Sequence, residues 1–378
     1  MKGDSVSLLQ QLIQAKSVTP VDDGCQRILQ DRLTALGFTI YPLTFGPVQN
    51  FYARLGAQSP NLCMAGHTDV VPTGPESQWS LPPFAGEIRD ERIYGRGACD
   101  MKGGLAAMVA AVERFLQQSP TFPGSISFLV TGDEEADAVD GTVKVVEWLA
   151  QRGEKLDYCL LSEPTGQSMA GDCVKNGRRG SVNGTLTIFG KQGHVAHPHL
   201  ADNPIHKAMP ILDRLARLPL DEGNAHFPPS CLQLTSLKAG AGATNVIPAL
   251  VEVAFNIRFC TENTPQSLET LVRQTLDASG AQYQLEMKTS ALPFLAPTGA
   301  LLANVERAIL QETGQKPHLS TSGGTSDARF IAPYCPQTLE LGVTNNSAHH
   351  VDEYVTLDDL DRLTRIYTSI LKNIFLPV

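Results

Sequence analysis

The sequence predicts an α/β protein with a mostly parallel sheet between two layers of helices (α/β/α), into which a smaller α+β domain is inserted. Three observations predict this fold class. In the first half, short apolar runs alternate with helical patterns, which is typical of βαβ units. From about residue 180 the order changes to β-α-β-β-α-β, as in a ferredoxin-like unit. After about residue 293 a helix, a strand and a long helix complete the chain.

Residues 1–179 alternate between buried strands and amphipathic helices. Along the chain they read NLCMAGHTDVV (strand), GGLAAMVAAVERFLQQ (helix), GSISFLVTG (strand), DGTVKVVEWLAQRG (helix) and LDYCLLSEP (strand). The first helix has apolar residues at 105, 108, 109, 112, 115 and 116, which share one face. Strands joined by helices pair in parallel, and such sheets collect their sites at the carboxyl ends of the strands.

Residues 180–293 follow a different pattern. They read SVNGTLTIFGKQGH (strand), NPIHKAMPILDRLARL (helix), SCLQLTSLKAG and VEVAFNIRFC (strands), TPQSLETLVRQTLDASG (helix) and AQYQLEMKTSA (strand). Thr264 is the expected N-cap of the second helix. Beyond them lie ALLANVERAILQETG (helix), QTLELG (strand) and TLDDLDRLTRIYTSILKNIF (helix). We therefore predict one α/β domain from residues 1–179 plus 294–378, with residues 180–293 inserted as a second domain.

Composition excludes several classes of protein. The 378 residues are 42% hydrophobic and 18% charged, which is enough apolar material for two cores. The net charge of −9, without a Lys/Arg cluster, argues against nucleic acid or an anionic membrane as a partner. No apolar stretch is long enough to span a bilayer, and the N-terminus lacks the features of a signal peptide. The eight cysteines are scattered without a C-x-x-C pair, so we expect reduced thiols in a cytoplasmic protein.

Potential metal ligands follow the buried strands of the first domain. Taken singly, each would more often be a cap or a solvated loop residue. Three adjacent acids at one strand end also repel one another unless positive charge lies beside them. Four such clusters, three at equivalent strand ends and one at a helix start, predict a metal centre; they are His67-Thr68-Asp69, Asp100, Asp133-Glu134-Glu135 and Glu163.

His67 and Asp69 are two residues apart on an extended segment, so their side chains share a face. This spacing suits Asp69 as a carboxylate that orients the imidazole without binding metal itself. The alternative is that Asp69 caps a turn before Pro72.

Several motifs in the same order closely resemble the di-zinc aminoacylase and carboxypeptidase superfamily. They are GHTDVVPTG, GRGACDMKGG, TGDEEADAVDGT, LSEPT and GKQGHVAHPHLADNP. A second set narrows the resemblance to the branch that hydrolyses N-succinyl-LL-2,6-diaminopimelate to succinate and LL-2,6-diaminopimelate, in lysine biosynthesis. It consists of VKNGRRGS, GATNVIP, NIRF, STSGGTSDARFIA and HHVDE. The resemblance covers essentially the whole chain.

The resemblance implies two Zn²⁺ ions per subunit, with Co²⁺ or Mn²⁺ possible in the second site. One ion would have His67, Glu163 and Asp100, the other His349, Glu135 and Asp100, so that Asp100 bridges both. Three protein ligands and an open position are typical of catalytic zinc. The four positive charges of two ions would also offset the adjacent acids.

The resemblance further implies that Glu134 moves protons. Adjacent residues on an extended segment point to opposite sides, so Glu135 could face a metal while Glu134 faces the substrate. His194 of the inserted domain would stabilise the oxyanion across the interface of a homodimer, and that domain would serve as lid and dimerisation domain. Candidate residues for binding a polyanionic amide substrate are Arg178, Ser181, Asn245, Arg258 and Thr325.

The sequence departs from the family in a few places. Ala136-Asp137 replace a common Gly-Pro, His197 replaces a frequent Tyr, and the residues around His349 differ. His350 lies next to the expected ligand, but Glu353, four residues after His349, matches the family register. Rival functions are acetylornithine deacetylase, another N-acyl-amino-acid deacylase or dipeptidase of the superfamily, and a catalytically silent metal-binding scaffold. Retention of Glu134 argues against the last, because binding metal does not require it.

Overall fold

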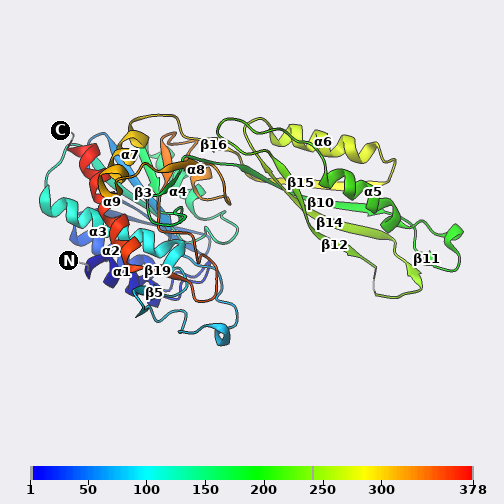
Figure 1. Ribbon diagram of the computed structural model, residues 1–378, viewed down its shortest axis with the longest axis horizontal. Coiled ribbons are helices and arrows are strands. Elements are labelled where there is room, and N and C mark those ends of the chain that lie inside the picture. Colours follow the sequence, from blue (N-terminus) through cyan, green and yellow to red (C-terminus); the bar gives the residue numbers. More distant parts are fainter. Residues whose placement is uncertain (1–2, 241, 377–378) are drawn as a thin grey trace. The chain divides into compact units, whose positions relative to one another are not determined.

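A computed structural model describes residues 3–240 and 242–376, and the chain forms two compact units (Figure 1). Unit 1 comprises the chain up to Asn176, the segment Ala296–Ser320 and the chain from Ser326 onward. Unit 2 comprises Gly177–Leu295 and Thr321–Thr325. Each unit has its own hydrophobic core, as expected for domains of this size.

Unit 1 is built on an eight-stranded sheet of order β1-β2-β6-β3-β7-β18-β8-β17. Parallel pairs join the central strands β6, β3, β7 and β18, and also β8 with β17. The pairs β1–β2, β2–β6 and β18–β8 are antiparallel. The predicted mostly parallel sheet is therefore confirmed. The strands are β1 (Thr39–Phe45), β2 (Val48–Gly56), β3 (Asn61–His67), β6 (Ser125–Thr131), β7 (Tyr158–Leu161), β8 (Cys173–Lys175), β17 (His318–Ser320) and β18 (Thr338–Glu340).

Helices cover both faces of this sheet. β3 and β6 are buried at every residue, which explains why they read as continuous apolar runs. On one face α1, α3, α7 and α9 share the core. On the other, Trp148 of α4 packs against Tyr41 and Tyr52 at ring distances of 5.6 and 6.2 Å. The helices are α1 (Gly3–Gln14), α2 (Cys25–Ala35), α3 (Gly103–Gln118), α4 (Thr142–Gln151), α7 (Ala300–Thr313), α8 (Ala328–Ile331) and α9 (Leu357–Phe375).

Short elements of unit 1 shape its loops. A three-stranded antiparallel sheet joins β19 (Tyr354–Thr356), β5 (Arg92–Tyr94) and β4 (Glu87–Arg89). It brings the segment before α9 next to the segment before α3. Two short helical turns lie in the same region of the chain. They are η1 (Glu76–Gln78), a 3₁₀ turn, and η2 (Ala98–Lys102), a single π-helical turn that leads into α3.

Unit 2 contains a four-stranded antiparallel sheet of order β12-β14-β10-β15 with helices α5 and α6 packed on it. Counted along the chain this order is 2-3-1-4, so the predicted ferredoxin-like unit is confirmed. Thr264 caps α6 by accepting from the amide of Ser267 at 3.1 Å. The elements are β10 (Gly180–Phe189), α5 (Pro204–Ala216), β12 (Cys231–Ala239), β14 (Leu250–Phe259), α6 (Pro265–Asp277) and β15 (Tyr283–Ala291).

Smaller elements complete unit 2. Two short pairs are β11 (Gly193–His194) with β13 (Val246–Ile247), and β9 (Gly177–Arg178) with β16 (Phe294–Leu295). The loop after β11 contains η3 (Pro198–Leu200), a 3₁₀ turn.

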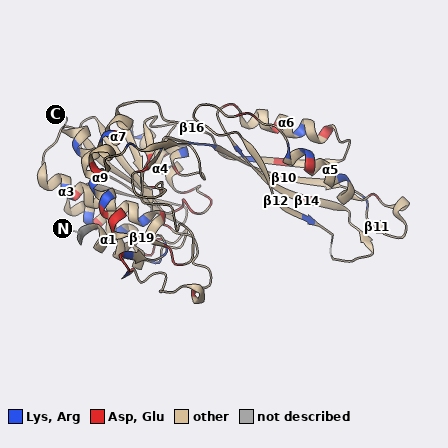
Figure 2. Cartoon of the chain, in the orientation of Figure 1, with Lys and Arg blue, Asp and Glu red and all other residues tan. Residues whose placement is uncertain are grey.

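The charged side chains and the cysteines are arranged as the composition predicts. Lys and Arg are interspersed with Asp and Glu on the helices of both units (Figure 2). Within the described residues, no helix has the length and apolar character needed to cross a membrane. All eight cysteines are free, and seven of them are buried.

Candidate metal centre

The carboxyl ends of parallel strands bring three of the predicted groups together. His67 is the last residue of β3 and lies opposite Thr131, the last residue of β6, in the parallel register. The acids 133–135 begin two residues beyond the end of β6, and Glu163 lies two residues beyond β7. Because β6, β3 and β7 are neighbours in the sheet, these side chains gather at one edge.

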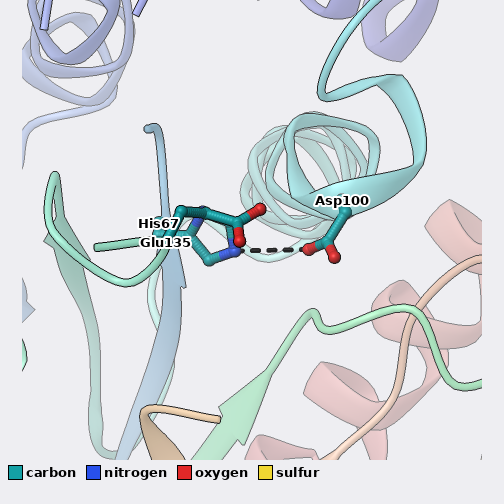
Figure 3. Close-up of side chains that lie close together, drawn as sticks. All are labelled: His67, Asp100 and Glu135. Atoms are coloured by element: carbon teal, nitrogen blue, oxygen red, sulfur yellow. Dashed lines mark ion pairs between the residues drawn. The ribbon is translucent and has the colours of Figure 1, made fainter. Parts of the chain in front are cut away.

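Asp100 reaches this edge from η2. Its backbone is not helical (φ −121°, ψ 99°), and the Asp100–Met101 peptide bond is cis. Asp100 Oδ1 lies 3.3 Å from His67 Nε2, and the Glu163 carboxylate lies 3.9 Å from the same nitrogen. Figure 3 shows His67, Asp100 and Glu135 converging, with Asp100 on the segment that leads into α3.

His349 completes the group from the loop before β19. Its Nε2 lies 2.9 Å from Glu135 Oε1 and 3.4 Å from Asp100 Oδ2. The side chain is 49% exposed, whereas His67 is buried. Two imidazoles therefore face the two oxygens of one carboxylate, and each has a further acid beside it.

These residues fit a divalent metal ion. His67, Asp100 and Glu135 each offer a ligand atom, and the three atoms all lie within 4.8 Å of one another. His67 Nε2 and Asp100 Oδ1 are buried, and neither makes a hydrogen bond in the described structure. Buried polar atoms without partners are costly, and these two are oriented toward a common point, as the donors of one cation site would be. Imidazole and carboxylate donors suit Zn²⁺, Co²⁺ or Mn²⁺.

Electrostatics within the group follow from the mixture of imidazoles and acids. Burial alone would lower the pKa of His67, but Asp100, Asp69 and Glu163 together raise it well above its ordinary value. Contacts with Asp100 and Glu135 raise the pKa of His349 to about 10. For Asp100, burial would raise the pKa, yet the two imidazoles hold it below its ordinary value. The acids thus strongly favour positive charge at this place.

The acids after β6 lie in a turn over residues 134–137, so the expectation of an extended segment was wrong. Asp69 anchors this turn, because its two oxygens accept from the amides of Glu134 at 3.3 Å and Glu135 at 3.1 Å. The acceptor nearest to His67 Nδ1 is the main-chain carbonyl of Asp69 at 2.9 Å, with Oδ1 at 3.6 Å. Asp69 therefore orients the ring through its main chain, and burial raises the pKa of its carboxyl to about 6.

Asp133, which had no expected role, is buried and accepts from the amides of Val139 and Asp140, both at 2.9 Å. It closes the loop that carries Glu134. Burial, followed by the charges of Glu163 and Asp327, raises the pKa of Glu134 well above its ordinary value.

The other predicted residues lie in unit 2. His194, on β11, is exposed, and its Nδ1 accepts from the amide of Ala196 at 3.0 Å. The main chain of Asn245 accepts from Val195 at 3.1 Å, so Asn245 lies beside the His194 strand.

A second group forms around β9, β10 and β14. Ser181 and Arg258 are paired residues on β10 and β14, and Ser181 Oγ accepts from Asn256 at 3.0 Å. Arg178 Nη1 donates to the carbonyl of Ser322 at 3.3 Å, in the segment that includes Thr325.

Two buried residues that sequence reasoning left without a role hold the metal-centre loops. Glu353 is fully buried and accepts from the amides of Gly97, Cys99 and Asp100 at 2.9, 2.9 and 3.0 Å. Arg96 pairs with it at 2.8 Å. The sequence signal for Glu353 was its position four residues after His349, which was used only to align His349 with the family motif.

Comparison with known proteins agrees with this geometry. Residues 63–373 match the model of peptidase family M20/M25/M40. A relative from Magnetococcus marinus, named succinyl-diaminopimelate desuccinylase, is 53% identical over 99% of both chains. A protein of the same name from Acinetobacter baumannii (strain SDF) is 53% identical over 98% of this chain and 99% of that one. An M20 family metallo-carboxypeptidase from Sulfolobus solfataricus shares the fold, with a TM-score of 0.81, 17% identity and 98% coverage of each chain. The predicted resemblance is confirmed, and the chain belongs to peptidase family M20/M25/M40.

Proposed function

We propose that this hydrolase removes succinate from N-succinyl-LL-2,6-diaminopimelate. The observation that carries the proposal is the 53% identity, over 99% of both chains, with a relative named succinyl-diaminopimelate desuccinylase. Free cysteines support a reducing, cytoplasmic location.

Two metal ions per subunit, Zn²⁺ in the first place, would be held by the two sets of ligands. His67, Glu163 and Asp100 would hold one, and His349, Glu135 and Asp100 the other. The contacts of Asp100 support two positions, since Oδ1 lies 3.3 Å from one imidazole and Oδ2 lies 3.4 Å from the other. Bound ions would polarise the scissile carbonyl and lower the pKa of water.

Glu134 would take a proton from the attacking water and deliver it to the leaving amine. Its raised pKa supports this role, because a carboxyl that binds a proton more readily is a better base near neutral pH. Asp69 would keep Glu134 and Glu135 in place through the two amides that it accepts from.

Unit 2 would supply groups that bind the substrate. The amide of Ala196 donates to His194 Nδ1, so the neutral ring carries its proton on Nε2. That tautomer is a hydrogen-bond donor, as a group that stabilises an oxyanion must be. Arg178 and Arg258 would bind carboxylates of the substrate, with Ser181, Asn245 and Thr325 as neutral donors.

Unit 2 would also pair two copies of the chain in a homodimer. β12 is an edge strand of its sheet and is exposed from Gln233 to Ala239, with Leu237 57% exposed. Exposed apolar edge strands are sites where a second chain adds. Leu237→Lys should shift the protein from dimer to monomer in sedimentation experiments; a monomeric parent would contradict this part of the proposal.

Substrate and metal are tested together. The purified protein should contain about two divalent ions per chain, lose hydrolysis after chelation and regain it with Zn²⁺. It should also hydrolyse N-succinyl-LL-2,6-diaminopimelate far faster than N-acetylornithine or a dipeptide. A preference for acetylornithine would contradict the proposed substrate, but it would not contradict the proposed metal centre.

A further inference from the structure

Glu353 is fully buried and holds the loop that carries Asp100. Its Oε2 accepts from the amide of Gly97 at 2.9 Å and from Arg96 Nη1 at 2.8 Å. Its Oε1 accepts from the amides of Cys99 at 2.9 Å and Asp100 at 3.0 Å. A carboxylate offers about four acceptor positions, so this single loop uses them all.

Arg96 links the same loop to the other ligand-bearing segments. Its Nη1 also donates to the carbonyl of His350 at 3.1 Å, and Nη2 lies 3.4 Å from the carbonyl of Pro72 and 3.5 Å from that of His349. Arg96 is 2% exposed, and its guanidinium lies 5.1 Å from the ring of Trp79. The loops after β3, before α3 and before β19 therefore meet at one guanidinium.

The main chain strengthens this connection. The amide of Gly95 donates to the carbonyl of Glu353 at 2.9 Å, and Tyr354 on β19 pairs with Tyr94 on β5. The segment that follows His349 thus lies directly along the segment that precedes Asp100.

We propose that Glu353, together with Arg96, is the positioning residue that sets the main chain of Asp100 relative to His349. The proposal rests on the proposed function, in which these two residues hold metal. Asp100 would have to present one oxygen on the side of His67 and the other on the side of His349. Distances from ligand atom to metal tolerate a deviation of only about 0.2 Å. A shift of the 97–100 loop would therefore cost a shared ligand and loosen both ions.

Glu353→Gln tests this role with little change in shape. The amide keeps one acceptor oxygen and turns an NH₂ group toward main-chain N–H donors. Two of the four bonds become donor–donor contacts, so the loop should move. Exchange of the amide hydrogens of Gly97, Cys99 and Asp100 should speed up, and Zn²⁺ affinity should fall about 10-fold to 100-fold, as for other partners of ligand residues. The variant should lose kcat at limiting Zn²⁺ and recover most of it at saturating Zn²⁺.

Asp221→Asn is the matched control. Asp221 accepts from the main-chain amides of Gly223 at 2.8 Å and Ser230 at 2.9 Å and from the side chain of Asn263 at 2.7 Å, in unit 2, which contains none of the expected metal ligands. The control should speed exchange in its own loop and keep the Zn²⁺ affinity of the parent. If Glu353→Gln does not fold, Glu353→Asp keeps the charge with a shorter reach and should show a smaller loss of affinity.

The measurement is competition for Zn²⁺ with a chromogenic chelator, alongside hydrogen exchange. A Glu353→Gln or Glu353→Asp protein whose loop exchanges faster while Zn²⁺ binds as in the parent would overturn the positioning role. So would an equal loss of affinity in Asp221→Asn. A parent that binds no Zn²⁺ would overturn the proposed function as well, which separates the two failures.

Discussion

Glu134 and Glu135 are adjacent residues with different surroundings. Glu135 places its carboxylate 2.9 Å from His349, whereas the carboxyl of Glu134 lies near the charges of Glu163 and Asp327. Asp327 is buried at the start of α8, and neither of its oxygens makes a hydrogen bond in the described structure. Burial first, and then these neighbouring acids, raise the pKa of Glu134, so it holds a proton more readily than an isolated acid.

Glu134→Gln should separate catalysis from metal binding. Gln keeps the shape of the side chain but cannot exchange a proton, so hydrolysis should fall about 100-fold to 10,000-fold. Metal content should stay at the parent level, because the expected ligands are unchanged. Asp137→Asn is the control, since Asp137 is an exposed acid of the same turn, and it should change neither quantity. Parent-like turnover by Glu134→Gln would refute the role of Glu134, which elemental analysis and initial rates would show.

Strand order explains which residues of the site were predictable. His67, the acids after β6 and Glu163 follow buried apolar strands, so their meeting at one edge follows from parallel pairing. Arg96 and Glu353 are 257 positions apart, and no local pattern indicates that they touch. The turn over residues 134–137 was also missed, because the four residues Glu-Glu-Ala-Asp include neither Gly nor Pro, the strongest turn signals.

At the scale of elements, long regular segments were predictable and short edge elements were not. β3 and β6 were predicted correctly because every residue in them is buried and the strands are continuous apolar runs. α6 was predicted correctly because Thr264 caps it. The β1–β2 hairpin was missed: β1 is half exposed and contains Pro42, which weakens its strand pattern. β8 and β17 have three residues each, too few for a period to show.

Gly342, just after β18, lets two strand ends approach each other. A Cβ there would lie 2.2 Å from the carbonyl oxygen of Glu163 and 2.6 Å from that of Ser162. Both neighbours are main-chain atoms, so Gly342→Ala should push the Glu163 segment away and cost about 1–3 kcal/mol of stability. Urea unfolding of the metal-free protein measures this. Gly324→Ala, where a Cβ meets open space, should cost much less, and equal costs would contradict the steric explanation.

The loop between α5 and β12 should make unit 2 sensitive to acid. Asp221 accepts from the amides of Ser230 at 2.9 Å and Gly223 at 2.8 Å, and from Asn263 at 2.7 Å. Burial alone would raise the pKa of Asp221, but these bonds outweigh it and lower the pKa to about 2. A carboxyl with a lowered folded pKa stabilises the fold above its unfolded pKa of about 4, and loses this effect as the pH falls toward 2.

Asp221→Asn should therefore be less stable than the parent at neutral pH, with a difference that shrinks between about pH 4 and pH 2. Urea unfolding at a series of pH values measures that difference. Asp213→Asn provides the control, because Asp213 is exposed on α5 and pairs with Arg217, the C-cap residue of this helix. A difference that stays constant down to pH 2 would show that the carboxylate is not what stabilises this loop.

At the scale of the whole molecule, the chain carries two separate cores. Residues from β3, α3, α7 and α9 fill the first, and residues from β10, β14, α5 and α6 fill the second. The five expected metal ligands all belong to unit 1. Sequence patterns predicted both folds because each unit has its own periodicity, parallel and buried in one, alternating and antiparallel in the other.

Removal of metal should therefore lower the thermal stability of unit 1 and leave that of unit 2 unchanged. One ion that binds to the folded state alone would stabilise unit 1 by about 2.7 kcal/mol at a hundredfold excess of metal over Kd. For a domain of this size that corresponds to a rise of roughly 5–10 °C in Tm. Calorimetry of the chelated and Zn²⁺-loaded protein should show one transition that moves and another, from unit 2, that stays. The Asp221→Asn variant identifies the transition of unit 2, which should shift down while the metal-dependent one does not. If Zn²⁺ moved both transitions equally, the two cores would unfold as one, and the separation of the units would be wrong.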